Sequence, residues 1–185
     1  MFKVVDGVLE GARACPSPNF NERPRDTVVD LLVIHNISLP PGQFGTGCVE
    51  AFFQNQLDVN AHPYFAEIAH LQVSAHLLIL RTGEVVQFVN LNQRAWHAGQ
   101  SCFAGREQCN DFSIGIELEG TDTEPYTFQQ YQVLAQVTGA LQQAYPAISA
   151  EHITGHEHIA PNRKTDPGPA FNWAYYRQLI KAADR

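Results

Sequence analysis

The sequence predicts an α/β protein with a central mixed sheet flanked by helices, and three patterns support this class. The continuous apolar run Leu31–Ile34 is typical of a strand that is covered on both faces. Two further apolar runs, 75–80 and 85–89, are joined by a turn sequence that contains Gly83 and predict an antiparallel hairpin. The segment 128–145 carries its apolar residues along one helical stripe. A hairpin combined with helical crossovers predicts strands of both directions.

The rest of the chain supplies shorter elements and two long loops. The other expected elements are a helix over 49–57, a strand over 112–118, a short strand over 148–154 and a closing helix over 171–183. The segment 92–110 is polar and irregular, and a loop of this length in a small domain is usually functional or disordered. A second loop, 155–169, is interrupted by Pro and Gly.

Length and composition indicate one ordinary globular domain that spans residues 1–185. The net charge of −7 argues against nucleic acid or an anionic membrane surface as a partner, because both attract basic proteins. The first 20 residues lack the basic start and long apolar stretch of a secretory signal. We therefore expect a cytoplasmic protein, and we expect it to be a monomer.

His35 is the first candidate for chemistry, because it is the polar end of an otherwise apolar strand. Ligands of open α/β sheets gather at the carboxyl ends of strands. His156 and Asp166 lie on the second loop, where three prolines hold the backbone in place. Two histidines and a carboxylate suit Zn²⁺ with a fourth position open to water. Spacing alone leaves this set open, with His158 as an alternative ligand that ranks below Asp166.

Glu117 and Lys164 are candidates for acid–base and charge-stabilising roles. Pattern alone slightly favours Glu117 and Glu119 as the solvated face of an edge strand. In a sheet that is covered on both faces, Glu117 would instead be a buried general base with a raised pKa. Lys164 is either a surface lysine or a fixed positive charge beside an oxyanion.

Three sequence blocks then identify a resemblance that covers residues 11–177. These blocks are LVIHNISLPPG at 32–42, SIGIELEGTD at 113–122, and the pair IAP and RKTDPG at 159–161 and 163–168. Together they closely resemble the AmpD-type 1,6-anhydro-N-acetylmuramyl-L-alanine amidases. These enzymes belong to a wider amidase family that is related to peptidoglycan recognition proteins, so the resemblance implies that fold.

The resemblance implies a ligand set, a reaction and a substrate. One Zn²⁺ would be held by His35, His156 and Asp166, with Glu117 as the catalytic carboxylate and Lys164 as the oxyanion-stabilising residue. The family cleaves the amide between the lactyl group of muramic acid and L-alanine of the stem peptide. AmpD-type members act on anhydro-muropeptides during cytoplasmic wall recycling, and their loss induces β-lactamase in several Gram-negative bacteria. The alternatives are a muropeptide-binding module without catalysis and an amidase of intact peptidoglycan.

Five residues are expected to bind substrate. Asn36, Trp96 and His97 form a hypothetical wall for the sugar, since Asn36 adjoins a metal ligand and Trp96 offers an apolar face. Trp96 could equally anchor its own loop. Gln72 and Gln108 stand where AmpD-type relatives carry arginines suited to the carboxylates of the stem peptide. Glutamine brings no charge, so this end of the substrate pocket is expected to differ from those relatives.

Overall fold

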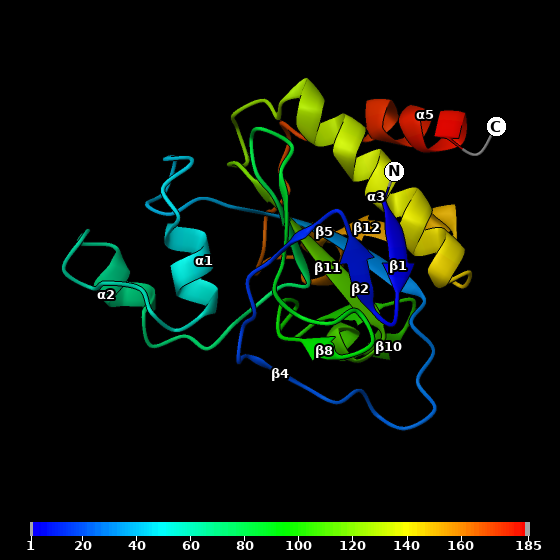
Figure 1. Ribbon diagram of the computed structural model, residues 1–185, viewed down its shortest axis with the longest axis horizontal. Helices are drawn as coiled ribbons and strands as arrows, with labels where there is room; N and C mark the ends of the chain where they lie inside the picture. The colour runs from blue at the N-terminus through cyan, green and yellow to red at the C-terminus, as the bar shows by residue number, and fades with distance from the viewer. Residues whose placement is uncertain (1, 184–185) are drawn as a thin grey trace.

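A six-stranded mixed sheet forms the centre of the computed structural model, which describes residues 2–183 (Figure 1). Its strands, in spatial order, are β12 (Ile153–Gly155), β5 (Leu31–Ile37), β11 (Ser113–Glu119), β6 (Leu77–Ile79), β7 (Val85–Gln87) and β3 (Arg13–Ala14). The first four are parallel, β6 and β7 form the antiparallel hairpin, and β3 runs parallel to β7. The predicted mixed sheet and hairpin are therefore confirmed.

Short strands and helices surround this sheet. The strand pairs are β1 (Lys3–Val5) with β2 (Val8–Glu10), β4 (Phe20–Asn21) with β8 (Arg94–Ala95), and β9 (Cys102–Phe103) with β10 (Arg106–Glu107). The α-helices are α1 (Cys48–Phe53), α2 (Phe65–Ile68), α3 (Phe128–Ala144), α4 (His156–Ile159) and α5 (Trp173–Ala183), with 3-10 turns η1 (Cys109–Asp111) and η2 (Ala150–His152). The helix expected over 49–57 ends at Phe53, and the loop expected over 155–169 opens with the helical turn α4. No helix within residues 2–183 combines the length and apolar character that a membrane crossing requires.

Helices α3 and α5 cover one face of the sheet and enclose the largest hydrophobic cluster (Figure 1). Leu32 and Ile34 of β5 and Ile116 of β11 lie in this cluster and are fully buried. Helix α3 begins with a capping box, in which the Thr127 hydroxyl accepts a hydrogen bond from the Gln130 amide and the Gln130 side chain accepts one from the Thr127 amide. Strand and helix periodicity supply a mainly apolar interface here, in which the buried polar side chains of Gln130 and Thr138 are hydrogen-bonded.

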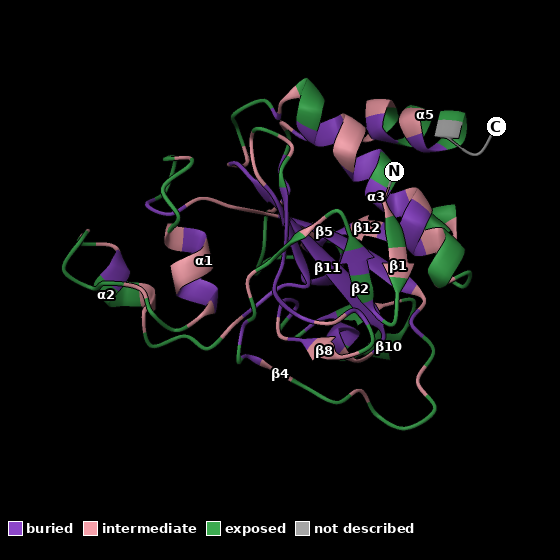
Figure 2. Ribbon diagram, in the orientation of Figure 1, coloured by how far each residue is buried: buried purple, intermediate pink, exposed green. Residues whose placement is uncertain are grey.

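The opposite face of the sheet is covered by two smaller clusters that leave a space between them. One cluster joins α1 and α2 to the hairpin through Phe53, Phe65 and Leu78. The other packs Leu31 and Val33 of β5 against Ile159 of α4 and against the segment after β8, through Ala98 and Phe112. Figure 2 shows that β5 and β11 are buried along nearly their whole length. Polar residues at the ends of these strands are thus enclosed without belonging to either cluster.

Candidate active site

His35, His156 and Asp166 converge at the carboxyl end of β5. His35 follows Leu31 and Val33 on the face away from α3, and its side chain is 1% exposed. Its Nδ1 atom lies 3.0 Å from Nδ1 of His156 and 3.0 Å from Oδ2 of Asp166. One ligand atom from each of the three residues lies within 4.8 Å of the others. The three predicted ligands therefore come together from two distant parts of the chain.

Hydrogen bonding shows that this cluster suits a cation. His156 Nε2 lies 3.0 Å from the carbonyl oxygen of Ala98, which can only accept a hydrogen bond. A neutral imidazole in this position carries its proton on Nε2 and turns the Nδ1 lone pair toward Asp166 Oδ2, 3.1 Å away. Two acceptor atoms at this distance repel each other unless a positive charge lies near both. Two imidazole nitrogens and one carboxylate oxygen match the ligands of a catalytic metal site.

Electrostatics favour the metal-binding forms of two of the three residues, His35 and Asp166. Burial lowers the pKa of His35 to about 4, although the contact with Asp166 opposes this effect. Burial alone would raise the pKa of Asp166, but the close contacts with the His156 and His35 rings outweigh it and lower the pKa below its ordinary value. At neutral pH His35 is therefore a neutral donor with a free lone pair, and Asp166 is a carboxylate.

Glu117 lies next to the cluster because its strand is paired directly with that of His35. The two residues are partners in the parallel register of β5 and β11. Its side chain is 8% exposed, and its Oε2 atom has no hydrogen-bond partner among the described residues. Burial raises its pKa well above the ordinary value, the charge of Asp166 adds to this, and Lys164 opposes it. The interpretation of Glu117 as part of a solvated edge strand is wrong, because β11 lies between β5 and β6.

Glu119 occupies the same face of β11 but has a different environment. Its carboxylate accepts hydrogen bonds from the backbone amides of Gly45, at 2.5 Å, and Arg81, at 3.0 Å. These bonds attach the loop before α1 and the turn of the hairpin to the end of β11. Glu119 is therefore a structural carboxylate, whereas Glu117 is free to react.

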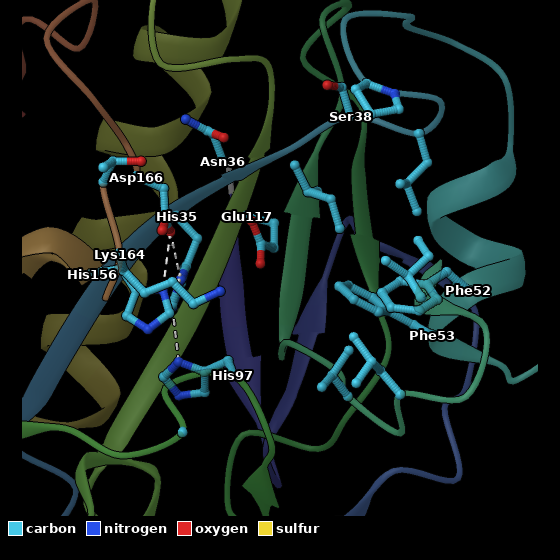
Figure 3. A pocket seen from close by; sticks show the side chains of 18 of the residues that line it. His35, Asn36, Ser38, Phe52, Phe53, His97, Glu117, His156, Lys164 and Asp166 are labelled. Atoms are coloured by element: carbon cyan, nitrogen blue, oxygen red, sulfur yellow. Dashed lines mark hydrogen bonds and ion pairs between the residues drawn. The ribbon is translucent and has the colours of Figure 1, made fainter. Parts of the chain in front are cut away.

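A cavity of about 960 Å³ opens in front of these residues and reaches the wall formed by α1 and α2 (Figure 3). Lys164 lines it from the loop after α4, and its side chain is exposed there. Its charge acts on both Glu117 and His35. Phe52 and Phe53 line the opposite, apolar end. The cavity thus combines a cluster that could hold a metal, a carboxyl group and a cation at one end with room for a large substrate.

Comparison with known proteins agrees with this geometry. The sequence profile of the N-acetylmuramoyl-L-alanine amidase family matches residues 25–169. This chain belongs to that family. The 1,6-anhydro-N-acetylmuramyl-L-alanine amidase AmpD of Citrobacter freundii is 62% identical over 175 residues, which cover 95% of this chain and 93% of the relative. The chain is therefore an amidase of the type that the sequence blocks indicated.

Solved structures of this amidase family share the fold. A crystal structure of a selenomethionine AmpD derivative superposes with a TM-score of 0.93 at 61% identity, and covers 96% of this chain and 98% of that one. The Escherichia coli amidase AmiD, in a complex with the substrate anhydro-N-acetylmuramic acid-L-Ala-D-gamma-Glu-L-Lys, superposes with a TM-score of 0.61 at 26% identity. That match covers 96% of this chain and 65% of AmiD.

The amidase cavity contains four of the five residues expected to bind substrate. Asn36, Gln72, Trp96 and His97 line it. The Asn36 amide also donates to Asp122, at 2.8 Å, so it anchors a neighbouring loop. Trp96 is half-buried, and its indole N–H donates to Asn21 Oδ1 at 2.7 Å. Trp96 is thus both a loop anchor and a cavity wall, and its contact with sugar stays a prediction.

Gln108 does not reach the amidase cavity. It precedes η1 with a left-handed backbone (φ 61°), and its side chain is exposed outside the cavity lining. Asn110 of η1 lines the cavity, whereas Gln108 is not among its lining residues, and the contact of Gln108 with the stem peptide stays a prediction. His158 is also absent from the cluster, since the helical turn α4 directs it away from His156 toward Trp173.

Two contributors to the amidase site could not be recognised in the sequence. The Ala98 carbonyl accepts from His156 and from Arg163, whose guanidinium lies 2.6 Å away. Arg163 also donates to the Gln100 carbonyl. These bonds join the 96–101 loop to the loop that carries Lys164 and Asp166. Every residue has a backbone carbonyl, so the residue type at position 98 gives no indication of this contact. The residues around Arg163 show no periodic pattern that would predict its position.

Proposed function

We propose that this amidase hydrolyses the amide between the lactyl group of 1,6-anhydro-N-acetylmuramic acid and L-alanine of the stem peptide. The convergence of His35, His156 and Asp166 beside the unpartnered Glu117, in one large cavity, carries the proposal. The anhydro form of the sugar is taken from the substrate named for the 62% identical relative. A role in peptidoglycan recycling follows from that substrate.

We infer that the cofactor is one Zn²⁺ per chain, held by His35, His156 and Asp166. Two histidine nitrogens and one carboxylate oxygen form a donor set that zinc hydrolases use, and they leave one coordination position open. When bound, such an ion supplies Lewis-acid activation of water and of the scissile carbonyl. The unshared lone pairs of His156 and Asp166 support this assignment, because they face each other across 3.1 Å.

Glu117 is proposed as the proton carrier. Within residues 2–183 no group hydrogen-bonds to its Oε2 atom, which can accept the proton of the attacking water. The same carboxyl group can then return the proton to the departing nitrogen of L-alanine. Burial makes the carboxylate a stronger base by raising its pKa, while Lys164 limits that rise and favours the ionised form.

Lys164 is proposed to stabilise the negative charge that develops on the carbonyl oxygen. It lines the cavity close enough to affect the pKa values of both His35 and Glu117. The backbone amide of Lys164 donates to the Ala160 carbonyl at 3.0 Å, and this bond fixes the start of its side chain. Because the cation is already in place, it can stabilise this charge without a rearrangement of the site during the reaction.

The decisive experiment combines elemental analysis with a comparison of substrates. We expect one zinc per chain, loss of hydrolysis on chelation and recovery with zinc, and faster release of L-alanine peptides from anhydro-muropeptide than from whole sacculi. Muropeptide binding without metal or hydrolysis would indicate a binding module. Faster release from sacculi would indicate an amidase of intact peptidoglycan. Either outcome would contradict the proposal.

We also propose a cytoplasmic location and a monomeric state for the recycling enzyme. Cell fractionation and light scattering of the purified protein test these two points independently of the reaction. Recovery of the protein in the periplasm, or a stable dimer in dilute solution, would contradict them.

A further inference from the structure

A row of buried histidine rings continues from the metal-binding cluster into the protein. His97 Nδ1 lies 2.8 Å from His35 Nε2, and His97 Nε2 lies 3.0 Å from the hydroxyl of Ser113. The rings of His35 and His97 meet edge to face, with centroids 5.0 Å apart. Both nitrogens of His97 are thus occupied by protein groups, although the ring also lines the cavity.

The positions of the protons in this row follow from the metal-binding role of His35. When Nδ1 of a neutral imidazole offers its lone pair to a cation, the single ring proton is on Nε2. His35 Nε2 must then donate to His97 Nδ1, which is an acceptor and carries no proton. The proton of His97 is therefore on Nε2, where it is donated to the Ser113 hydroxyl. Each bond in the row fixes the tautomer of the next ring.

The backbone around His97 holds its ring in this place. The side-chain oxygen of Asn110 accepts from the amides of both His97 and Ala98, at 3.1 and 2.8 Å. On the strand side, the ring rests against Gly115 of β11. A Cβ atom at Gly115 would lie 2.5 Å from ring atoms of His97, a distance that such contacts do not reach. Any larger residue at this position would displace the ring.

We propose that His97 is a positioning residue for the metal ligand His35, and that Ser113 and Gly115 hold His97 in place. By accepting the Nε2–H of His35, it fixes the tautomer and orientation of that ring and makes Nδ1 a better donor. Outer partners of this kind commonly change metal affinity by about 10- to 100-fold. The inference rests on the proposed metal site and assigns to His97 a role other than sugar contact.

The test measures zinc affinity by chelator competition on the folded protein, with activity as a second readout. We expect His97→Leu, which fills the space but cannot accept, to weaken zinc binding by roughly 10- to 100-fold. His97→Asn places its Oδ1 on the same γ carbon as the lost Nδ1, so it should restore affinity to within a few-fold of the native protein. His70→Leu, at an exposed histidine outside the cavity, is the matched control.

A double-mutant cycle separates positioning from general damage to the fold. Gly115→Ala should weaken zinc binding by displacing the His97 ring, and it should have little further effect in the His97→Leu background. Equal effects in both backgrounds, or native affinity in His97→Leu, would overturn the inference. Lack of zinc binding by the native protein would instead refute the proposed function. Should His97→Leu fail to fold, Gly115→Ala compared with Ser113→Ala tests the same row of bonds.

Discussion

The two faces of the central sheet differ sharply, although the same strands supply both. Toward α3 and α5, β11 presents Ile114, Ile116 and Leu118, which are fully buried in apolar contacts. Toward the cavity, alternate residues of the same strand are Glu117 and Glu119, together with the small residues Ser113 and Gly115. One face therefore stabilises the protein by hydrophobic burial, while the other carries chemistry within an equally buried environment.

The polar face also shows how two identical side chains acquire different roles. Glu119 is satisfied by two backbone amides, whereas Glu117, two residues earlier, keeps an unpartnered oxygen beside the metal-binding cluster. An unsatisfied buried carboxylate costs stability, and such costs are commonly found at functional sites. The comparison teaches that the lack of a hydrogen-bond partner among the described residues, rather than burial or residue type, distinguishes the carboxylate proposed to react.

The largest expected effect is on catalysis by Glu117→Gln. Removal of the proton carrier should lower kcat by roughly 10²–10⁴-fold. Zinc content should stay near one per chain, because Glu117 is not among the three ligands. Thermal unfolding should show little loss of stability, since the change replaces a buried carboxyl group, whose Oε2 has no partner among the described residues, with a neutral amide of the same size. Loss of zinc together with activity would make Glu117 a ligand and contradict the assigned role.

Lys164→Ala should follow, with a loss in kcat of roughly 10²–10³-fold that is typical of removing one oxyanion donor. The affinity for zinc should change little, because Lys164 is not one of the three proposed metal ligands. Steady-state kinetics on anhydro-muropeptide measures the effect, and the exposed Lys181 supplies a matched Lys→Ala control. Turnover within a few-fold of the native enzyme would remove Lys164 from the mechanism.

On the apolar face, Ile116→Ala should act on stability instead of turnover. Truncation of a fully buried isoleucine typically lowers the free energy of unfolding by about 2–5 kcal/mol, because it loses burial and leaves a cavity. Denaturant unfolding measures the change, and kcat per folded molecule should remain near the native value. A large fall in kcat at full folding would show that the two faces are coupled.

The smallest expected effect is on stability, from Glu119→Gln. In the variant, one of the two oxygens that accept from backbone N–H groups becomes an NH2 group, which cannot accept. One buried backbone donor then lacks a partner, which lowers the free energy of unfolding by about 1–3 kcal/mol. Its kcat should fall far less than that of Glu117→Gln. If the two variants lose activity equally, the distinction between the structural and the reactive carboxylate fails.

By itself the sequence determined five of the six strands of the central sheet, their faces and the end of β5 as a place for ligands. These features follow from side-chain periodicity, which is a local property of the backbone. Periodicity also separated Ile116 from Glu117, but it could not show that β11 is central, because strand order depends on pairing between distant segments. For the same reason, the solvated interpretation of Glu117 was wrong.

Only the tertiary structure decided which polar groups meet. His35 is 121 residues from His156, 131 from Asp166 and 62 from His97, yet each pair lies within 3.0 Å. Contacts at hydrogen-bond distance depend on how loops pack over the sheet, and no spacing in the chain encodes them. Resemblance to known amidases indicated the three ligands, Glu117 and Lys164. The contacts of the Ala98 carbonyl with His156 and of His97 with His35 became visible only when the loops were placed around β5 and β11.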